Sequence, residues 1–288
     1  MASTELAYRP LTPADLAAAQ ALSLEAGWNQ SGDDWRAMIA AGAGLAVSAP
    51  EGIVATGLTL PYQLFGWIAM ILVTDARRRQ GIASEMLRRC MAWCAEHDLI
   101  AGLDATEAGR QVYLPLGFKD VYSLSRLVRA GPPPPSRGEA IGEVGVDAAL
   151  RPMTETDLPG VAAYDRTVFG ADRLPVLRYL LRRWPEAAWV AGDPVAGFCL
   201  GRGGRTMHQI GSLSARDEAS ALALLQAALA AVPGPVLIDV ADHQSSFRAA
   251  LDAAGFTRQR GYVRMLLDRS EPLDTPGEVY AIAGPELG

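Results

Sequence analysis

The pattern of apolar and polar positions changes twice between residues 67 and 96. Residues 67–73 form an unbroken apolar, β-prone run, and residues 74–81 are polar and basic. Beyond Gly81 the apolar side chains recur every three or four residues, as they do along one face of a helix. These helix-spaced positions are Ile82, Met86, Leu87, Cys90, Met91 and Cys94. The pattern therefore predicts a strand, a basic turn and a helix over residues 82–96 in direct succession.

This strand–turn–helix unit has the properties of an anion site. The start of a helix offers unpaired N–H groups and about half a positive charge. The turn contains Arg77, Arg78 and Arg79, and Gly81 allows a ligand to approach the backbone closely. A pyrophosphate group suits such a site.

The same kind of pattern gives the other elements of the N-terminal part. Predicted strands cover residues 8–10, 44–48, 53–60, 64–73, 99–105 and 118–128. Predicted helices cover residues 12–25, 33–42, 82–96 and 109–116. Thr12 is the expected N-cap of the first helix, with Pro13 at its first position. The order β-α-α-β-β-β-α-β-α-β predicts an α/β layer arrangement.

A proline-rich segment divides the chain. Residues 132–135 are four consecutive prolines, which favour polyproline II and are excluded from the interior of helices and sheets. We therefore expect a first domain over residues 1–130, a linker over 131–146 and a second domain over 147–270. Residues 271–288, which are rich in Pro, Gly and Glu, are expected to form a loose tail.

The second part of the chain repeats features of the first. Residues 150–158 (LRPMTETDL) repeat the pattern of residues 8–16 (YRPLTPADL). Late in each half a predicted helix is followed by Gly-Phe and a final strand, once at residues 117–118 and again at 255–256. Such self-similarity predicts two copies of one fold.

Composition and charge narrow the classes of function. The 288 residues are half apolar, and a net charge of −6 argues against general nucleic-acid binding. We expect no membrane span, since no apolar run approaches ~18 residues, and no signal peptide. Cys90, Cys94 and Cys199 show no disulfide framework, which favours a reducing, cytoplasmic location. The three histidines lie far apart, so no metal site is expected.

Two motifs at a characteristic separation resemble those of the GNAT superfamily of acyl-CoA-dependent N-acyltransferases. The first is a hydrophobic strand followed by Arg/Gln-x-x-Gly-x-Gly/Ala at the start of a helix, here residues 78–83. The second is a Tyr shortly before Gly-Phe, here Tyr113 and residues 117–118. The resemblance covers about residues 5–130. It implies a mixed, mostly antiparallel sheet flanked by helices, with acetyl-CoA as co-substrate.

Further segments resemble a tandem subgroup, in which a second, degenerate GNAT-like domain follows the first. These segments are residues 26–35, 104–109, 169–173, 197–203, 210–211 and 262–265. The second domain departs from the family at residues 211–220, which lack the Arg-x-x-Gly-x-Gly/Ala loop and contain Asp217 and Glu218. Negative charge there disfavours a phosphate ligand, so we expect one acyl-CoA site per chain, in the first domain.

The resemblance implies how acetyl-CoA would be held. Backbone groups of Ile71, Leu72 and Val73 bind the pantetheine arm like an added strand, and an N–H near Leu72 faces the thioester oxygen. Amides of the turn and the helix start hold the pyrophosphate, whereas Arg77 is expected to be solvated. The expected CoA contacts beyond the strand are Arg78, Arg79, Gln80, Gly81, Ile82, Ala83, Ser84, Thr106 and Gly109.

By the same resemblance, Tyr113 is the proton donor to the departing thiolate. The general base that deprotonates the amine is left open. Asp104 and Glu107 are candidates because they lie around the end of the strand before Tyr113, and Asp34 is a third. A water relay is the remaining alternative.

The expected acceptor is the primary amine of a small molecule, amino acids included. Trp28, Asn29, Asp34 and Trp35 form an aromatic and polar cluster in the expected acceptor wall. Asp165, Arg173 and Arg202 are further candidates in the second domain, where an arginine would clamp an acceptor carboxylate. Alternative functions are protein or peptide acetylation and non-catalytic acyl-CoA sensing. The chain is expected to be a monomer or homodimer.

Overall fold

The computed structural model describes residues 6–131, 150–232 and 234–288, which form two compact units. The units comprise residues 1–103 and 104–288. The units divide the chain earlier than the boundary expected after residue 130, because β6 (Phe118–Arg129) pairs antiparallel with β11 (Val236–Ala241) and β12 (Thr257–Leu267). The expected domain boundary stays a prediction. Residues 132–146 of the expected linker lie outside the described part of the chain.

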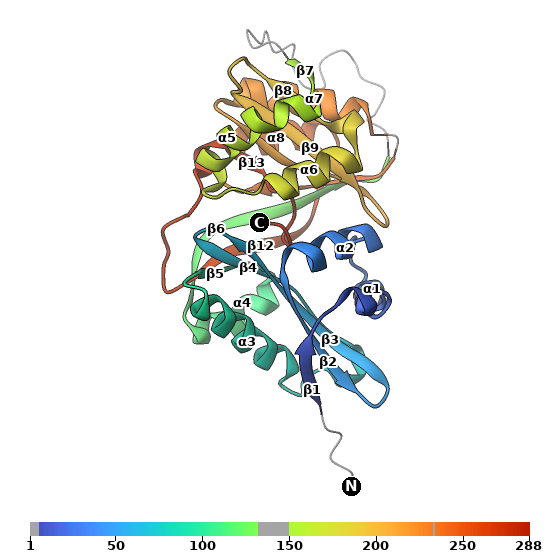
Figure 1. The fold of residues 1–288 in the computed structure, drawn as a ribbon. Coiled ribbons are helices and arrows are strands. Elements are labelled where there is room, and N and C mark those ends of the chain that lie inside the picture. The colour runs from blue at the N-terminus through green and yellow to red at the C-terminus, as the bar shows by residue number, and fades with distance from the viewer. Residues whose placement is uncertain (1–5, 132–149, 233) are drawn as a thin grey trace. The chain divides into compact units, whose positions relative to one another are not determined.

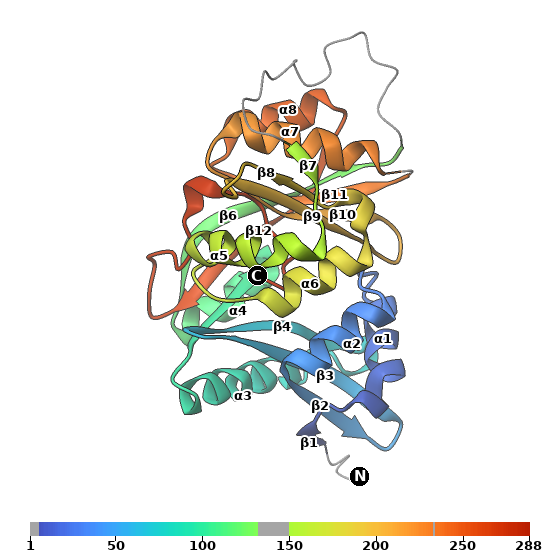
Figure 2. The same cartoon turned by 45° about the horizontal axis from the view of Figure 1, so that its top comes forward.

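The first unit is a sheet with strand order β1-β2-β3-β4-β5. Its strands are β1 (Ala7–Pro10), β2 (Ala43–Ala49), β3 (Gly52–Tyr62), β4 (Phe65–Val73) and β5 (Ile100–Ala105). The first four pair antiparallel, and β5 runs parallel to β4. Its helices are η1 (Pro13–Asp15), α1 (Leu16–Glu25), α2 (Gly32–Ala41), η2 (Asp75–Arg77) and α3 (Ile82–Glu96). In Figure 2, α3 lies on one face of this sheet, and α1 and α2 lie on the other.

The second unit is built on strands in the order β12-β6-β11-β13-β10-β9-β8-β7. The remaining strands are β7 (Leu150–Pro152), β8 (Trp189–Ala191), β9 (Gly197–Gly203), β10 (His208–Ala215) and β13 (Val279–Ala281). The α-helices are α4 (Glu107–Tyr113), α5 (Leu158–Phe169), α6 (Leu174–Arg183), α7 (Glu218–Ala230) and α8 (Ser245–Ala253). Short 3₁₀ helices are η3 (Leu114–Leu116), η4 (Glu155–Asp157), η5 (Pro185–Ala187) and η6 (Pro276–Glu278). In Figure 1, β6 and β12 run side by side as two long strands.

The observed architecture confirms the predicted α/β class with mixed, mostly antiparallel sheets. The strand–turn–helix pattern of residues 67–96 forms β4, η2 and α3, and α3 covers the predicted residues 82–96. Its apolar stripe packs inward, because Ile82, Met86 and Leu87 are buried. Cys90 and Cys94 belong to the same stripe and are buried, reduced side chains.

The sequence repeat corresponds to a repeated local structure. In the first copy, Asp15 accepts hydrogen bonds from the backbone and side chain of Thr12 and forms an ion pair with Arg9 at 2.7 Å. In the second copy, Asp157 does the same with Thr154 and Arg151, at 2.6 Å for the ion pair. The capping carboxylate and its arginine thus begin the first helical segment of each half.

Buried ion pairs join residues of the second unit that lie far apart in the sequence. Arg126 on β6 forms hydrogen bonds of 2.7 and 2.8 Å with both carboxylate oxygens of Asp239 on β11. Arg264 on β12 binds both oxygens of Asp104, each at 3.0 Å, and binds Asp274 at 2.9 Å. Breaking either pair would be strongly destabilising, because it would leave a buried charge without a partner.

Residues 271–288 do not form the loose tail that their composition suggests. They contain η6 and β13, and Val279, Tyr280 and Ala281 are at most 7% exposed. Composition misleads here because residues 279–283 are an apolar run within a Pro- and Gly-rich segment. Once β13 pairs with β10 and β11, that run is buried and its backbone groups are satisfied.

The capping aspartates give a stability prediction. The hydrogen bond from Arg151 holds the pKa of Asp157 well below its usual range, with burial opposing the shift. A lowered pKa means that the stabilisation is present above about pH 4 and is lost as the pH falls through the folded-state pKa. Asp157→Asn keeps an acceptor for Thr154 but loses the ion pair with Arg151, so it should lower the free energy of unfolding at pH 7 by about 0.2–1 kcal/mol.

Chemical denaturation at several pH values measures this difference. The gap between the native chain and Asp157→Asn should narrow as the pH falls below about 4. Asp252→Asn, at an exposed aspartate of α8, serves as the control and should change little at any pH. Equal stability of the native chain and Asp157→Asn at pH 7 would contradict the assignment.

Candidate functional site

The end of β4 carries a bulge that interrupts its pairing with β3. Thr56 of β3 pairs with Leu72, and Leu58 pairs with Ala69, so three steps on β4 oppose two on β3. Met70 in the bulge has a φ of 54°, and the hydroxyl of Thr56 donates to its carbonyl at 3.2 Å. A bulge turns the backbone groups of a strand away from the regular ladder.

Beyond this point β4 and β5 diverge. Their parallel register covers three pairs, from Phe65–Ile100 to Trp67–Gly102, although β4 continues to Val73. Residues 71–73 therefore lie beyond the last pair of the β4–β5 ladder, and their backbone forms an edge of β4. An extended ligand could bind such an edge as an added strand does.

The turn after β4 leads to the N-terminus of α3. Gly81 is its N-cap, with φ of 79°, and a side chain added there would meet no atom within 4 Å. No side chain caps α3, and Arg79 also has a positive φ, 62°. Backbone amides of residues 82–84 thus begin the helix beside an open glycine, which is the geometry of a phosphate cradle.

The arginines of the turn differ in their partners. Arg77 forms an ion pair with Glu51 at 2.7 Å and is only 21% exposed. Arg78 pairs with Asp75 and remains 53% exposed, while Arg79 is exposed. Of the three, Arg78 and Arg79 are therefore better placed to meet an anion, whereas Arg77 is held by Glu51 rather than solvated.

The corresponding place in the second unit is closed to an anion. The N-cap of α7 is Asp217, whose carboxylate accepts from the backbone N–H of Ser220 at 2.8 Å and from its hydroxyl at 3.1 Å. Glu218 adds a second acid in the first turn. These carboxylates occupy the donors and the favourable end of the helix dipole.

Two residues of the expected acceptor wall have structural roles instead. Trp35 is fully buried, and its indole N–H donates to Ser23 at 2.8 Å. Asp34 closes a capping box with Ser31, accepting from its backbone N–H at 2.6 Å and its hydroxyl at 2.7 Å. The Asp34 carboxylate thus holds the start of α2, and its expected role as substrate ligand or base stays a prediction.

The segment between α1 and α2 retains three polar or aromatic residues of interest. Trp28 is half-buried, and Asn29 is 7% exposed. Gln30, which the sequence did not single out, is 6% exposed, and its Oε1 atom has no hydrogen-bond partner. A buried carbonyl oxygen of this kind can accept a hydrogen bond from a ligand.

Tyr113 lies at the end of α4, and its ring packs against the same short helix. A side chain added at Gly109 would lie 3.0 Å from the ring, so the glycine leaves room for this close packing. The Phe118 ring is tilted against it at 6.0 Å between centroids. Burial raises the pKa of Tyr113, which keeps the phenol protonated and able to donate at neutral pH.

Thr106 and Gly109 bond to each other. The Thr106 hydroxyl accepts from the Gly109 N–H at 3.2 Å and caps α4. This local bond, together with the packing of Tyr113, explains why Thr and Gly stand at these positions. Their expected contact with CoA stays a prediction.

The candidate bases differ sharply in their surroundings. The Asp104 side chain is fully buried, and both oxygens accept from Arg264. Burial raises the pKa of Asp104 and Arg264 opposes the shift, so the carboxylate is held by its arginine and is poorly placed to accept a substrate proton. Glu107 is exposed in the first turn of α4, where its Oε1 atom accepts from Gln111 at 3.3 Å.

The candidates for a carboxylate clamp are already engaged. Arg173 binds both oxygens of Asp165, at 2.8 and 2.9 Å, as well as Ser212 at 2.7 Å and the backbone oxygen of Gly288 at 3.1 Å. Arg202 is 1% exposed and forms an ion pair with Glu286. These contacts give Asp165 and Arg202 partners within the chain, and their expected role as substrate ligands stays a prediction.

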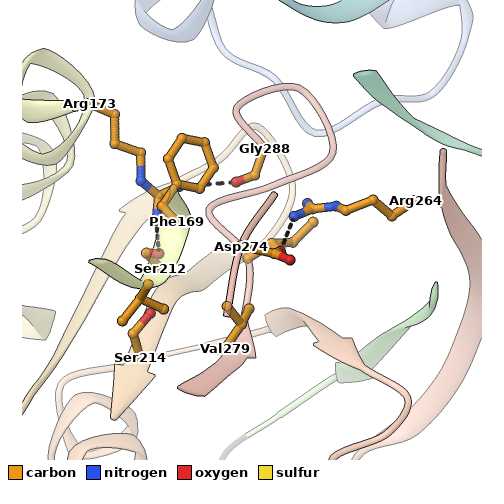
Figure 3. Close-up of a pocket in the computed structure, with 10 residues that line it drawn as sticks. Phe169, Arg173, Ser212, Ser214, Arg264, Asp274, Val279 and Gly288 are labelled. Atoms are coloured by element: carbon orange, nitrogen blue, oxygen red, sulfur yellow. Dashed lines mark hydrogen bonds and ion pairs between the residues drawn. The ribbon is translucent and has the colours of Figure 1, made fainter. Parts of the chain in front are cut away.

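Figure 3 shows a small pocket of the second unit beside these groups. The Arg173 guanidinium lies 3.8 Å from the centre of the Phe169 ring and faces Ser212 and Gly288. Arg264 and Asp274 line the same pocket. In the described residues no three His, Cys, Asp or Glu side chains gather as a metal site requires. No helix there is long and apolar enough to cross a membrane.

Sequence reasoning gave no role to Arg126, Asp239 and Arg264. A signal was present, because each is the charged member of an otherwise mainly apolar strand segment: LSRLV, LIDVA and VRMLL. A charge inside a buried strand requires a partner. The sequence shows the requirement, but not which distant strand provides that partner.

Two family descriptions match the chain. The acetyltransferase (GNAT) family matches residues 16–118, and an acetyltransferase (GNAT) domain matches residues 161–281. The chain is 23% identical over 223 residues to the uncharacterized N-acetyltransferase YitH of Bacillus subtilis, with 77% of this chain and 76% of YitH covered.

Solved structures show the same fold over nearly the whole chain. A putative acetyltransferase from Pyrococcus horikoshii has a TM-score of 0.80 and 20% identity, covering 100% of this chain and 98% of its own. A tandem GNAT protein from the clavulanic acid biosynthesis pathway has a TM-score of 0.59 and 16% identity, covering 91% and 98%.

Asp104 provides a test that separates a structural from a catalytic carboxylate. Asp104→Asn removes the negative charge that two hydrogen bonds from Arg264 engage, and should lower the free energy of unfolding by about 3 kcal/mol. The matched control is Asp120→Asn, whose exposed pair with Arg110 contributes about 0.2–1 kcal/mol. Denaturant unfolding of both variants measures the difference. Full stability of Asp104→Asn together with lost turnover would identify Asp104 as the base instead.

Proposed function

Because the chain is an acetyltransferase of the GNAT superfamily with two GNAT domains in tandem, we propose that it acetylates the primary amine of a small molecule, using acetyl-CoA. The amine attacks the thioester directly while both substrates are bound. The observation that carries the proposal is the uncapped N-terminus of α3, which follows the bulged strand β4.

The residues of the first unit are suited to hold CoA. The strand edge at residues 71–73 offers backbone groups to a pantetheine arm, and residues 79–84 offer amides to a pyrophosphate. Exposed Arg78 and Arg79 add positive charge beside these amides. The only acid in the first turn of α3, Glu85, is neutralised by Arg88 and Arg89 at 2.8 and 2.9 Å. Of the acids nearby, Glu85 is paired with Arg88 and Arg89, and Asp75 is paired with Arg78, which leaves Arg79 as the positive charge best suited to a phosphate ligand.

Proton transfer is assigned to side chains of the second unit. Bound acetyl-CoA would supply the activated acyl group, and its departing sulfur needs a proton. The Tyr113 hydroxyl donates this proton, which its raised pKa keeps available. Asp104 and Asp34 are occupied by Arg264 and Ser31, so the exposed Glu107 or a water relay accepts the proton of the amine.

The acceptor pocket is assigned to Trp28, Asn29 and Gln30. The indole offers an apolar surface, and the amides offer groups that orient a polar substrate. Because Arg173 and Arg202 are engaged elsewhere, neither is available to bind an acceptor carboxylate. We therefore propose an amine acceptor whose recognition does not require a carboxylate. A panel of amino acids and their decarboxylated amines, read by thiol release, tests this point.

Tyr113→Phe tests the proton donor. It retains the ring that packs on Gly109 and Phe118 but removes the hydroxyl, so kcat should fall at least about 10²-fold while acetyl-CoA affinity changes little. Steady-state kinetics and calorimetry measure the two quantities. Tyr8→Phe, which retains its ring beneath Arg89, is the matched control. Unchanged turnover in Tyr113→Phe would reject the assignment.

Calorimetric titration with acetyl-CoA tests the number and place of the CoA sites. We expect one site per chain, because Asp217 caps the corresponding helix of the second unit. Arg79→Gln should raise Kd by about ten- to a hundredfold if a charge-assisted phosphate contact is lost. Arg36→Gln, at an exposed arginine of α2, is the control. Two equivalent sites, or equal Kd values for both variants, would contradict the assignment.

A further inference from the structure

We infer that residues 279–288 are a built-in occupant of the second GNAT domain. They lie where β10 and β11 diverge, which we call the groove of the second domain. It corresponds to the place in the first domain where β4 and β5 diverge, which is the proposed acyl-CoA groove. Residues 279–288 take the place that a pantetheine arm would occupy between β10 and β11. In naming pantetheine the inference rests on the proposed function, but the occupancy of the groove can be tested without any activity measurement.

The two grooves are built in the same way. The parallel ladder of β4 and β5 has three pairs, and so does that of β10 and β11, from His208–Val236 to Ile210–Ile238. In each case the first strand then bulges. On β10 the bulge lies between Ile210 and Leu213, where three steps oppose the two from Gly201 to Cys199 on β9. The same bulge and divergence therefore occur in both halves of the chain.

In the second domain the diverging strands enclose β13. Ala281 pairs antiparallel with Leu213 of β10 and with Val240 of β11, so one residue bridges both strands. The N–H of Ile282 also donates to the carbonyl of Asp239 at 3.0 Å. These are the backbone contacts by which an extended ligand adds to a strand edge.

The approach at the bulge is close enough to require a glycine. Gly211 has a φ of 144°, and a side chain added there would lie 2.0 Å from the carbonyl oxygen of Ile282. The groove is thus shaped around the backbone of residues 281–282. In the first domain the bulge carries Met70, a non-glycine residue, at the equivalent step of the strand.

Side chains of the second domain hold the rest of the segment. Arg202, buried on β9, forms an ion pair with Glu286 and a 2.9 Å hydrogen bond with Gln209. Arg173 donates to the backbone oxygen of Gly288 (Figure 3). Residues 279–284 and 286–288 are all buried. The two arginines that could clamp an acceptor thus bind a segment of their own chain.

The phosphate end of this groove is closed as well. Asp217 caps α7 with its own carboxylate, and Glu218 follows it. A CoA molecule would have to displace β13 and also place its pyrophosphate against two acids. In the second domain a strand of the same chain thus takes the place of a ligand. Because this strand is covalently attached, its binding involves no loss of translational freedom.

Gly211→Ala tests the occupancy without changing the segment itself. The added methyl group collides with Ile282, so amide hydrogen exchange of residues 279–283 should accelerate at least about tenfold. Gly203→Ala is the control, because a side chain there would come no nearer than 4.0 Å to any atom. Unchanged protection of residues 279–283 in Gly211→Ala would overturn the inference.

A chain ending at Glu278 tests the groove by complementation. Removing residues 279–288 should lower Tm, and a synthetic peptide of residues 276–288 should bind and restore it, whereas a scrambled peptide should not. Failure of the native peptide to bind a folded truncated chain would overturn the inference. If the truncated chain does not fold, hydrogen exchange in Gly211→Ala decides the question. Acetyl-CoA stoichiometry on Gly211→Ala reports separately on the proposed function and should stay at one.

Discussion

Opposite charges buried in the second unit pair residues that lie far apart in the sequence. Arg126 on β6 reaches Asp239, and Arg264 on β12 reaches Asp104, with each guanidinium binding both oxygens of its carboxylate. Separating either pair would leave a buried charge that costs several kcal/mol. The first pair joins β6 to β11, and the second joins β12 to the end of β5. Between β6 and β12 themselves the same arginines pack on aromatic rings, because Arg264 of β12 lies 5.3 Å from the Tyr122 ring of β6 and Arg126 of β6 lies 5.4 Å from the Tyr262 ring of β12.

This constraint also explains why the halves of the sequence repeat are not the compact units of the structure. The repeat predicts two equivalent halves on either side of a proline-rich linker. In the structure β6, the last strand before that linker, pairs with two strands that come after it. Local pattern identifies each strand correctly but contains no information about its partner. A buried arginine in an apolar strand is the only local trace of that partner.

The same bulge and strand divergence occur in both grooves, but the groups that bind there differ. A bulge after a short parallel ladder leaves backbone groups without a regular partner, and these groups must be satisfied. In the second domain β13 satisfies them, and Arg202 and Arg173 hold the residues that follow. In the first domain the corresponding edge precedes an uncapped helix and exposed arginines, which suits an anionic ligand. The second copy of the fold is then a scaffold that carries its own occupant.

The sequence by itself determined the local elements of this protein. Apolar spacing gave α3 and β4, capping chemistry gave the two helix starts at Thr12 and Thr154, and the glycine-containing basic turn indicated an anion site. It could not decide between a ligand and a structural role for Trp35, Asp34, Asp104 and Arg202, since each role uses the same side chain. Only the tertiary structure decided their partners within the chain, which are Ser23, Ser31, Arg264 and Glu286. The physical reason is that capping and periodicity act within a few residues, whereas burial and charge pairing depend on partners far along the chain.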